Sequence, residues 1–179
     1  MRIIGGKYKH KRFDVPTTFK ARPTTDFAKE SLFNILQHSA DIDFDAEPTA
    51  LDLFAGTGSI SLELLSRGCR RVVSVERDYR HWQFLMRLSH ELRDEAWLPL
   101  HADVFRYVPR CTEQFDLIFA DPPYALDKLR TIPNLVFESQ LLAPDGLFIL
   151  EHGRTDSFTD HPHFVDHRNY GSVNFSFFQ

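Results

Sequence analysis

From residue 49 onward, short apolar runs alternate with longer amphipathic stretches. The apolar runs predict strands at 50–54, 71–76, 98–100, 115–120 and 147–150, of which 98–100 is the weakest because it contains Pro99. The amphipathic stretches predict helices at 60–65, 79–92 and 128–137, the last with an interruption at Pro133. Apolar strands that alternate with helices are typical of a parallel sheet covered by helices on both faces.

The two ends of the chain break this alternation. Residues 163–168 and 172–178 are extended runs joined at Tyr170-Gly171, which predicts an antiparallel hairpin at the end of the sheet. Nearer the N-terminus, a helix is predicted to begin at Thr25 or Asp26, either of which can cap it. Its predicted apolar face consists of Phe27, Leu32, Phe33, Ile35 and Leu36. The whole pattern predicts an α/β fold with a mostly parallel, Rossmann-like sheet and an antiparallel C-terminal strand.

Length and composition exclude several classes of protein. A chain of 179 residues can bury one core but not two ordinary ones, so we expect a single domain over 1–179, with an arm at 1–24 and a catalytic core at 25–179. No apolar run reaches the roughly 18–20 residues of a membrane span, and the start of the chain turns basic too early for a signal peptide. The two cysteines form no disulfide framework, which favours a reducing, cytoplasmic compartment.

The first 24 residues differ from the rest of the chain in charge. A net charge of −4 argues against a protein that is basic throughout, yet cationic side chains gather at this end: Arg2, Lys7, Lys9, Lys11, Arg12, Lys20 and Arg22. Together with Gly5-Gly6 and two prolines, they predict a short β-hairpin arm that binds RNA phosphates. The alternative is a solvated edge hairpin whose lysines discourage strand pairing.

Three loops at predicted strand ends suit a ligand that contains adenosine. The first carries a strand into a helix, where glycines allow a sharp turn and close approach of a ligand; its residues are Asp52, Leu53, Phe54, Ala55, Gly56 and Gly58. Glu76 ends the next strand about 20 residues later, where an acid can bind ribose hydroxyls. Asp103 and Val104 follow the third strand and can contact adenine. Residue 61 is serine, so the loop lacks the full dinucleotide fingerprint, which weakens the case for a nicotinamide enzyme.

The tetrapeptide Asp121-Pro122-Pro123-Tyr124 follows the fourth predicted strand. Two prolines stiffen this segment and hold the groups beside them in place. An exocyclic base nitrogen is a poor nucleophile because its lone pair is delocalised into the ring. If Asp121 and the Pro122 carbonyl accept its N–H bonds, the lone pair turns toward a methyl donor, while Tyr124 stacks on the flipped base. The segment therefore predicts an amino-methyltransferase, and the alternative is an ordinary proline-rich turn.

These motifs together resemble those of the bacterial 16S ribosomal RNA guanine-N2 methyltransferases of the RsmD type. The resemblance rests on 22–26 with 30–34, on 52–58 and on 121–124, and it extends to 2–6 and 170–173. It implies a class I methyltransferase fold, S-adenosylmethionine as cofactor, and methylation of one guanine at N2 within an assembled small ribosomal subunit. The family often has arginines after its Thr-Thr-Asp turn, where this chain has Phe27 and Lys29.

Two other functions stay open at this point. DNA adenine-N6 methylation uses the same tetrapeptide, although the chain has no segment large enough for a target-recognition insertion. A non-catalytic RNA-binding or assembly protein would show a damaged reactive loop, and the loop is intact. The cluster Asp160, His161, His163, Asp166 and His167 suggests a metal site, but Pro162 separates two of its histidines and the mechanism needs no metal. We therefore expect a solvated segment there, no metal and a monomer.

Overall fold

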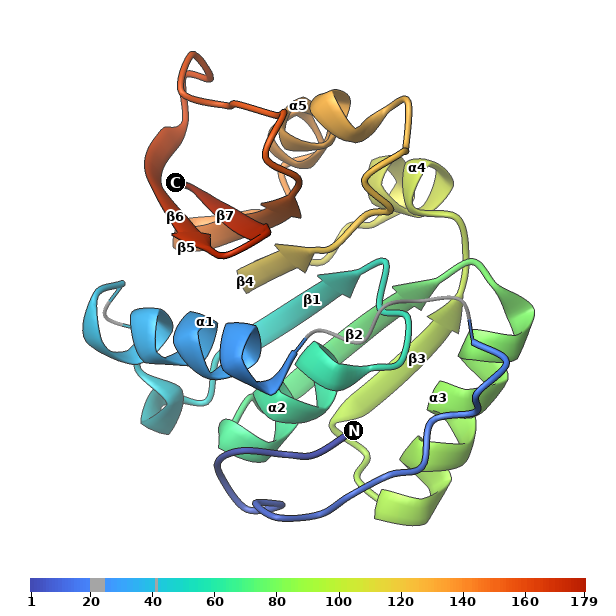
Figure 1. Cartoon of the computed structure of the whole chain (residues 1–179). Helices are drawn as coiled ribbons and strands as arrows, with labels where there is room; N and C mark the ends of the chain where they lie inside the picture. Colours follow the sequence, from blue (N-terminus) through green and yellow to red (C-terminus); the bar gives the residue numbers. More distant parts are fainter. Residues whose placement is uncertain (20–24, 41) are drawn as a thin grey trace.

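The centre of the protein is one mixed sheet of seven strands, whose strands are drawn as arrows in Figure 1. The computed structural model describes residues 1–19, 25–40 and 42–179. In chain order the strands are β1 (Thr49–Leu53), β2 (Arg71–Glu76), β3 (Trp97–His101), β4 (Phe115–Ala120), β5 (Leu142–His152), β6 (Phe164–Tyr170) and β7 (Val173–Phe178). Their spatial order is β3-β2-β1-β4-β5-β7-β6. The first five strands in this order are parallel to one another, and β7 pairs antiparallel with both β5 and β6.

Helices cover both faces of this sheet (Figure 1). One face carries α1 (Asp26–His38), α2 (Ser59–Arg67) and α3 (Tyr79–Leu92), and the other carries α4 (Val104–Tyr107) and α5 (Ile132–Glu138). Short 3₁₀ turns complete the connections: η1 (Phe44–Ala46), η2 (Val108–Arg110) and η3 (Leu129–Thr131). The core accordingly has two layers, one on each side of the sheet, and the interior strand β1 is buried along its whole length. Among the described residues, no helix has both the length and the apolar character needed to cross a membrane.

The predicted elements agree closely with the observed ones, including the strand that contains Pro99. That proline is tolerated because β3 is an edge strand that pairs only with β2. Thr25 caps α1 as predicted, since its hydroxyl accepts a bond from the Ala28 N–H at 3.1 Å. Two features carried too little sequence pattern to be predicted: the four-residue helix α4 and the early start of β5 at Leu142.

One predicted core residue is wrong. Phe27 is 67% exposed, and its ring lies against Tyr170 at 6.2 Å between centroids. The buried face of α1 instead begins at Ala28 and Lys29, which are each 1% exposed. The charged Lys29 side chain occupies a core position because the buried Glu63 carboxylate lies 3.7 Å from its Nζ.

The N-terminal arm packs on the helical layer of α2 and α3 rather than standing free (Figure 1). A hairpin-like loop forms in which the Ile3 N–H donates to Lys11 O and the His10 N–H donates to Ile3 O, each at 3.0 Å. One isolated antiparallel bridge joins Arg2 and Arg12, so the predicted hairpin is present only in this minimal form. Ile3 and Phe13 are buried in the core and attach the arm.

Candidate active site

The residues predicted to bind the cofactor and the base gather at the carboxyl-end edge of the sheet. Strands β1, β2, β3 and β4 run parallel, so the loops that follow them lie side by side. Strand order reverses next to β1, because the chain moves outward through β2 and β3 and then returns to β4 on the other side. Ligands of open α/β sheets bind at this reversal, outside the carboxyl ends of the strands.

Two glycines in the loop after β1 have different structural roles. Gly56 has a φ of 55°, and an added Cβ would meet only the Phe54 carbonyl oxygen, at 3.8 Å, so the space beside it is open. Gly58 has a φ of 75°, and an added Cβ would lie 2.7 Å from Leu85 Cδ2, so this glycine allows α3 to pack closely. Phe54 also has a positive φ, 64°, which is strained for a residue with a side chain. Of these two glycines, Gly56 is the one that has open space for a ligand beside its main chain.

Glu76 lies beside this loop at the end of β2, and its side chain is buried. Its Oε2 accepts a bond from the Gly56 N–H at 2.7 Å, and its Oε1 accepts one from the Asp78 N–H at 2.7 Å. Each oxygen keeps a further lone pair, so the carboxylate can both shape the glycine loop and bind ribose hydroxyls. The ribose contact stays a prediction.

Asp52 ties β1 to α2. Its Oδ2 accepts bonds from both the N–H and the hydroxyl of Ser61. Burial raises the pKa of Asp52 to about 7, with a further contribution from the charge of Glu76 and opposition from the two Ser61 bonds. The neighbouring residues Leu53 and Ala55 are buried as well, and their main chains are bonded within the protein: the Leu53 carbonyl accepts from the Asp121 N–H, and the Ala55 N–H donates to the Val75 carbonyl at 3.0 Å. Their contact with a cofactor stays a prediction.

Asp103 and Val104 form the start of α4. The Asp103 side chain caps this helix by accepting a bond from the Phe105 N–H at 3.0 Å, and its other oxygen lies 3.6 Å from the Arg77 guanidinium. Val104 is 3% exposed and packs into the layer beneath. A capping aspartate still has free lone pairs, so the predicted contact with an adenine amino group is compatible with this geometry.

The reactive loop begins directly after β4. The Asp121 N–H donates to the Leu53 carbonyl at 3.3 Å, which joins this loop to the strand that precedes the glycine loop. Pro122 is buried and Pro123 is exposed. Tyr124 is 43% exposed, and its hydroxyl donates to Glu151 Oε1 at 2.9 Å. The four residues thus present one acid and one oriented aromatic ring beside the candidate cofactor loop.

The negative charges of two neighbouring carboxyl groups, Glu151 and Asp52, act on Asp121. The pKa of Asp121 lies well above its ordinary value because the group is buried and because Glu151 and then Asp52 add negative charge nearby. Burial also raises the pKa of Glu151 to about 7, opposed by the Tyr124 hydrogen bond. Carboxyl groups so arranged resist ionising together, so the pair Asp121 and Glu151 retains a proton at a pH where an ordinary pair would have none.

No sequence motif marks Glu151 as a site residue. It ends the apolar run of β5, just as Glu76 ends β2 and Asp121 follows β4. An acid at the end of a buried strand is therefore the signal that could have found it. That signal is weak, because the sequence does not show that the strand with Glu151 pairs with β4.

The predicted RNA-binding side chains are distributed along the arm. Arg2 pairs with Asp26 at 3.1 Å, and Lys7 pairs with Asp94 at 2.7 Å. Lys7 is exposed despite this pair, and so are Lys9, Lys11 and Arg12. Two more, Lys20 and Arg22, lie outside the described residues. The described part of the arm therefore offers a small exposed basic surface, and its role in RNA binding stays a prediction.

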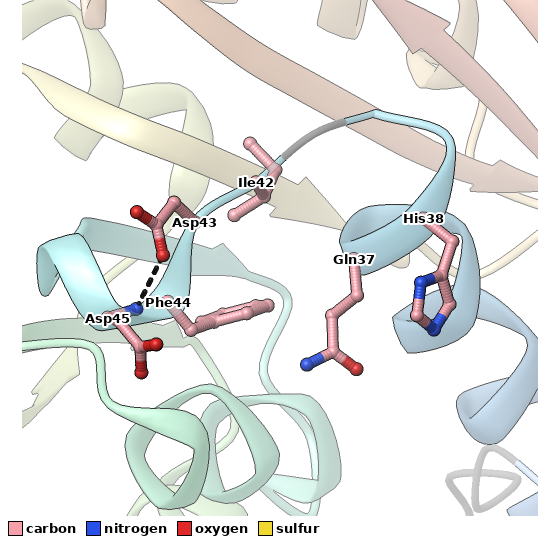
Figure 2. Close-up of a pocket in the computed structure, with 6 residues that line it drawn as sticks. All are labelled: Gln37, His38, Ile42, Asp43, Phe44 and Asp45. Atoms are coloured by element: carbon pink, nitrogen blue, oxygen red, sulfur yellow. Dashed lines mark hydrogen bonds between the residues drawn. The ribbon is translucent and has the colours of Figure 1, made fainter.

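Two other regions contain polar side chains but no converging site. Figure 2 shows a surface pocket between the end of α1 and η1, lined by Gln37, His38, Ile42, Asp43, Phe44 and Asp45. It lies before the amino end of β1, away from the predicted motifs. In the C-terminal segment, His161 bonds Asn134 and the His163 ring stacks on Phe137 at 4.0 Å between centroids. Across the described parts of the chain, no group of three or more His, Cys, Asp or Glu residues is placed to hold a metal ion.

Comparison with known proteins identifies the family. The sequence matches the family described as conserved hypothetical protein 95 over residues 1–179. The chain belongs to this family. A putative rRNA methyltransferase, YlbH of Bacillus subtilis, is 35% identical over 163 residues, covering 86% of this chain and 83% of the relative. Ribosomal RNA small subunit methyltransferase D of Escherichia coli is 31% identical over 151 residues, covering 84% and 74%.

The fold comparison agrees with the family assignment. The solved structure of the putative methyltransferase yhhF from Escherichia coli superimposes with a TM-score of 0.85 at 26% identity, covering 100% of this chain and 97% of that one. The predicted resemblance to RsmD-type enzymes and the predicted class I methyltransferase fold are therefore confirmed. As a member of this family, the chain is an S-adenosylmethionine-dependent methyltransferase.

Proposed function

We propose that this protein transfers a methyl group to the exocyclic N2 of one guanine in 16S ribosomal RNA of the small ribosomal subunit. The observation that carries the proposal is the position of Asp121 and Tyr124, which stand together at the end of β4 beside the glycine loop after β1. The relatives named as ribosomal RNA methyltransferases support RNA as the substrate.

The residues at the sheet edge fit the cofactor of this enzyme class. Gly56 leaves open space beside its main chain, and Glu76 keeps lone pairs for two adjacent hydroxyls. Asp103 is placed at the third strand end, where an adenine amino group would need an acceptor. S-adenosylmethionine supplies, when bound, a methyl group already activated by its sulfonium, so the protein has mainly to orient the acceptor nitrogen.

Asp121 and the Pro122 carbonyl orient that nitrogen. Each accepts one N–H bond of the guanine amino group, so the nitrogen lone pair points toward the methyl donor rather than into the ring. The exposed Tyr124 ring stacks on the flipped base, and the hydrogen bond from its hydroxyl to Glu151 holds the ring in place. The proton can leave N2 after the methyl group has been transferred, which reduces the need for a strong general base.

The basic arm positions the RNA in this proposal. The exposed side chains of Lys9, Lys11 and Arg12 contact phosphates, while the buried Ile3 and Phe13 keep the arm attached to the core. The chain then acts as one catalytic domain with its arm, as a monomer, on an assembled subunit in the cytoplasm. No metal takes part in the chemistry.

A methyl-transfer assay tests the proposal directly. Tritium-labelled S-adenosylmethionine is incubated with the protein and with small ribosomal subunits that lack this modification, with free 16S RNA and duplex DNA in parallel reactions. The labelled nucleoside is identified by mass spectrometry. Label in N2-methylguanosine from the subunit is the expected result. Label in N6-methyladenine of DNA would overturn the substrate, and absence of label would favour a non-catalytic protein.

A further inference from the structure

Glu151 lies in the reactive site although no motif includes it. Ala120 and Leu150 are paired across β4 and β5, so Asp121 and Glu151 are the next residues along these neighbouring strands. The charge of Glu151 acts on Asp121, and its Oε1 holds the Tyr124 hydroxyl. Glu151 therefore contacts or neighbours both side chains that handle the base.

One oxygen of this carboxyl group lacks a partner. Glu151 is 5% exposed, and its Oε2 is buried with no hydrogen-bond donor among the described residues. Burial of an acceptor without a donor is costly, so such a group requires an explanation.

The other two buried glutamates show that this fold can satisfy a buried carboxylate fully. Glu63 receives bonds on both oxygens, from the main-chain N–H groups of Ile4 and Gly5 and from Arg67. Glu76 also receives one main-chain N–H on each oxygen. Glu151 alone among these three keeps an unpaired oxygen, and it is the one beside the reactive loop.

Guanine carries a donor at the place where this acceptor is needed. Its Watson–Crick edge presents N1–H directly beside the N2 amino group, whereas adenine presents an acceptor nitrogen beside its amino group. A base whose amino group is held by Asp121 and Pro122 turns its adjacent ring nitrogen toward a neighbouring strand. The proton that the pair retains belongs on Asp121, which has the higher pKa and whose carbonyl oxygen still accepts an N–H bond. Glu151 is then the ionised member of the pair. An ionised carboxylate accepts hydrogen bonds only, so it favours guanine and repels the lone pair of adenine.

We propose that Glu151 is the residue that selects guanine: its Oε2 accepts the N1–H of the flipped base while Asp121 and Pro122 hold the N2 amino group. This inference rests on the proposed function, because it assumes that guanine N2 is the methyl acceptor. Glu151 thereby adds base specificity to a reactive loop whose chemistry suits either guanine or adenine. Its bond to Tyr124 fixes the carboxylate for this purpose.

The test uses 2-aminopurine, which keeps the exocyclic amino group of guanine but has no N1–H. The modified nucleotide is first located by mass spectrometry. Small subunits are then reassembled from ligated 16S RNA that carries either guanine or 2-aminopurine at that position. We expect the wild-type protein to prefer guanine in kcat/KM on the order of 10²-fold or more, since a site built for one hydrogen bond strongly rejects an analogue that lacks it.

Two substitutions separate base selection from a structural role. Glu151→Met removes the acceptor but nearly keeps the side-chain length, so we expect the preference for guanine over 2-aminopurine to fall close to one. Glu151→Gln keeps one acceptor oxygen and should give an intermediate preference. The exposed Glu138→Gln is the matched control and should retain the wild-type preference. Affinity for S-adenosylmethionine and the unfolding temperature confirm that each variant is folded.

The outcomes distinguish this inference from the function on which it rests. If both substrates lose activity equally in Glu151→Met, so that the preference persists, Glu151 only supports Tyr124 and the inference is overturned. If the wild-type protein forms no N2-methylguanosine at all, the proposed function itself fails. If the wild-type protein forms N2-methylguanosine and the Glu151→Met variant loses the preference for guanine over 2-aminopurine, the result supports both the proposed function and the role of Glu151.

Discussion

The buried ion pair between Lys29 and Glu63 allows a quantitative prediction. Glu63 is 0% exposed and accepts bonds from the Ile4 N–H at 2.9 Å, the Gly5 N–H at 2.8 Å and Arg67 Nε at 2.9 Å. Lys29 Nζ lies 3.7 Å from it. One carboxylate thus joins the arm, α1 and α2. Its loss should affect all three.

The two partners differ in what the removal of each leaves behind. Glu63→Met leaves the Lys29 ammonium with only neutral acceptors, the Arg2 carbonyl and the Ser59 hydroxyl. An uncompensated buried charge costs about 3–5 kcal/mol of unfolding free energy. Lys29→Met leaves Glu63 still bonded to Arg67 and to the arm, so about 1–2 kcal/mol is expected from the lost hydrogen bonds.

Urea unfolding and thermal melts measure this asymmetry. Glu63→Met should lower the unfolding temperature by roughly 10 °C, since about 2–4 °C is expected per kcal/mol in a domain of this size. The double variant should be more stable than Glu63→Met alone, because the buried Lys29 ammonium is no longer left without its carboxylate. Lys9→Met, on an exposed arm lysine, is the control and should change little. Equal losses in the two single variants, or simple addition in the double one, would refute this account of the pair.

Three further predictions address the site and the arm. Asp121→Ala should lower kcat on subunits by about 10²–10³-fold with cofactor affinity retained, as measured by methyl transfer and calorimetry; unchanged turnover would contradict its role. Replacement of Lys9, Lys11 and Arg12 by Gln should reduce the slope of log affinity for RNA against log salt by about 2, and an unchanged slope would remove the arm from the RNA contact. Because the pKa of Asp52 is raised to about 7, its contribution to stability is complete below about pH 4 and is lost as pH rises through 7. Asp52→Asn should therefore stabilise the cofactor-free protein more at pH 8 than at pH 5 in thermal melts, and equal effects would exclude a raised pKa.

The sheet could be predicted from the sequence because each buried strand is a local apolar run. Pro99 weakened that signal without removing the strand, since an edge strand needs fewer N–H donors. The pattern of apolar residues could not predict helix α4 or the early start of β5. A helix of four residues shows no period, and the first part of β5 is not an apolar run.

The site could be predicted only where its residues are close in sequence. Each of the loops at 52–58 and 121–124 is a continuous stretch of sequence, so the sequence alone predicts its chemistry. Lys29 and Glu151 are defined by neighbours that are distant in sequence. Lys29 is buried because Glu63 lies beside it, and Glu151 belongs to the site because β5 pairs with β4. Single-residue patterns contain no information on such pairs.

The antiparallel hairpin of β6 and β7 gives β5 a second paired edge. Glu151 is paired with Phe175, and the next residue, His152, bonds Ser176 through its ring at 2.8 Å. Without β7, the strand that carries Glu151 would be the margin of the sheet, free to twist and fray. The hairpin of β6 and β7 thus restricts the motion of the strand that carries the Glu151 carboxylate. If Glu151 selects the base as proposed, a truncation or a destabilising substitution in this hairpin would lower the selectivity for guanine before it weakened cofactor binding. Substrate selectivity would then depend on a segment far from the reactive loop in sequence.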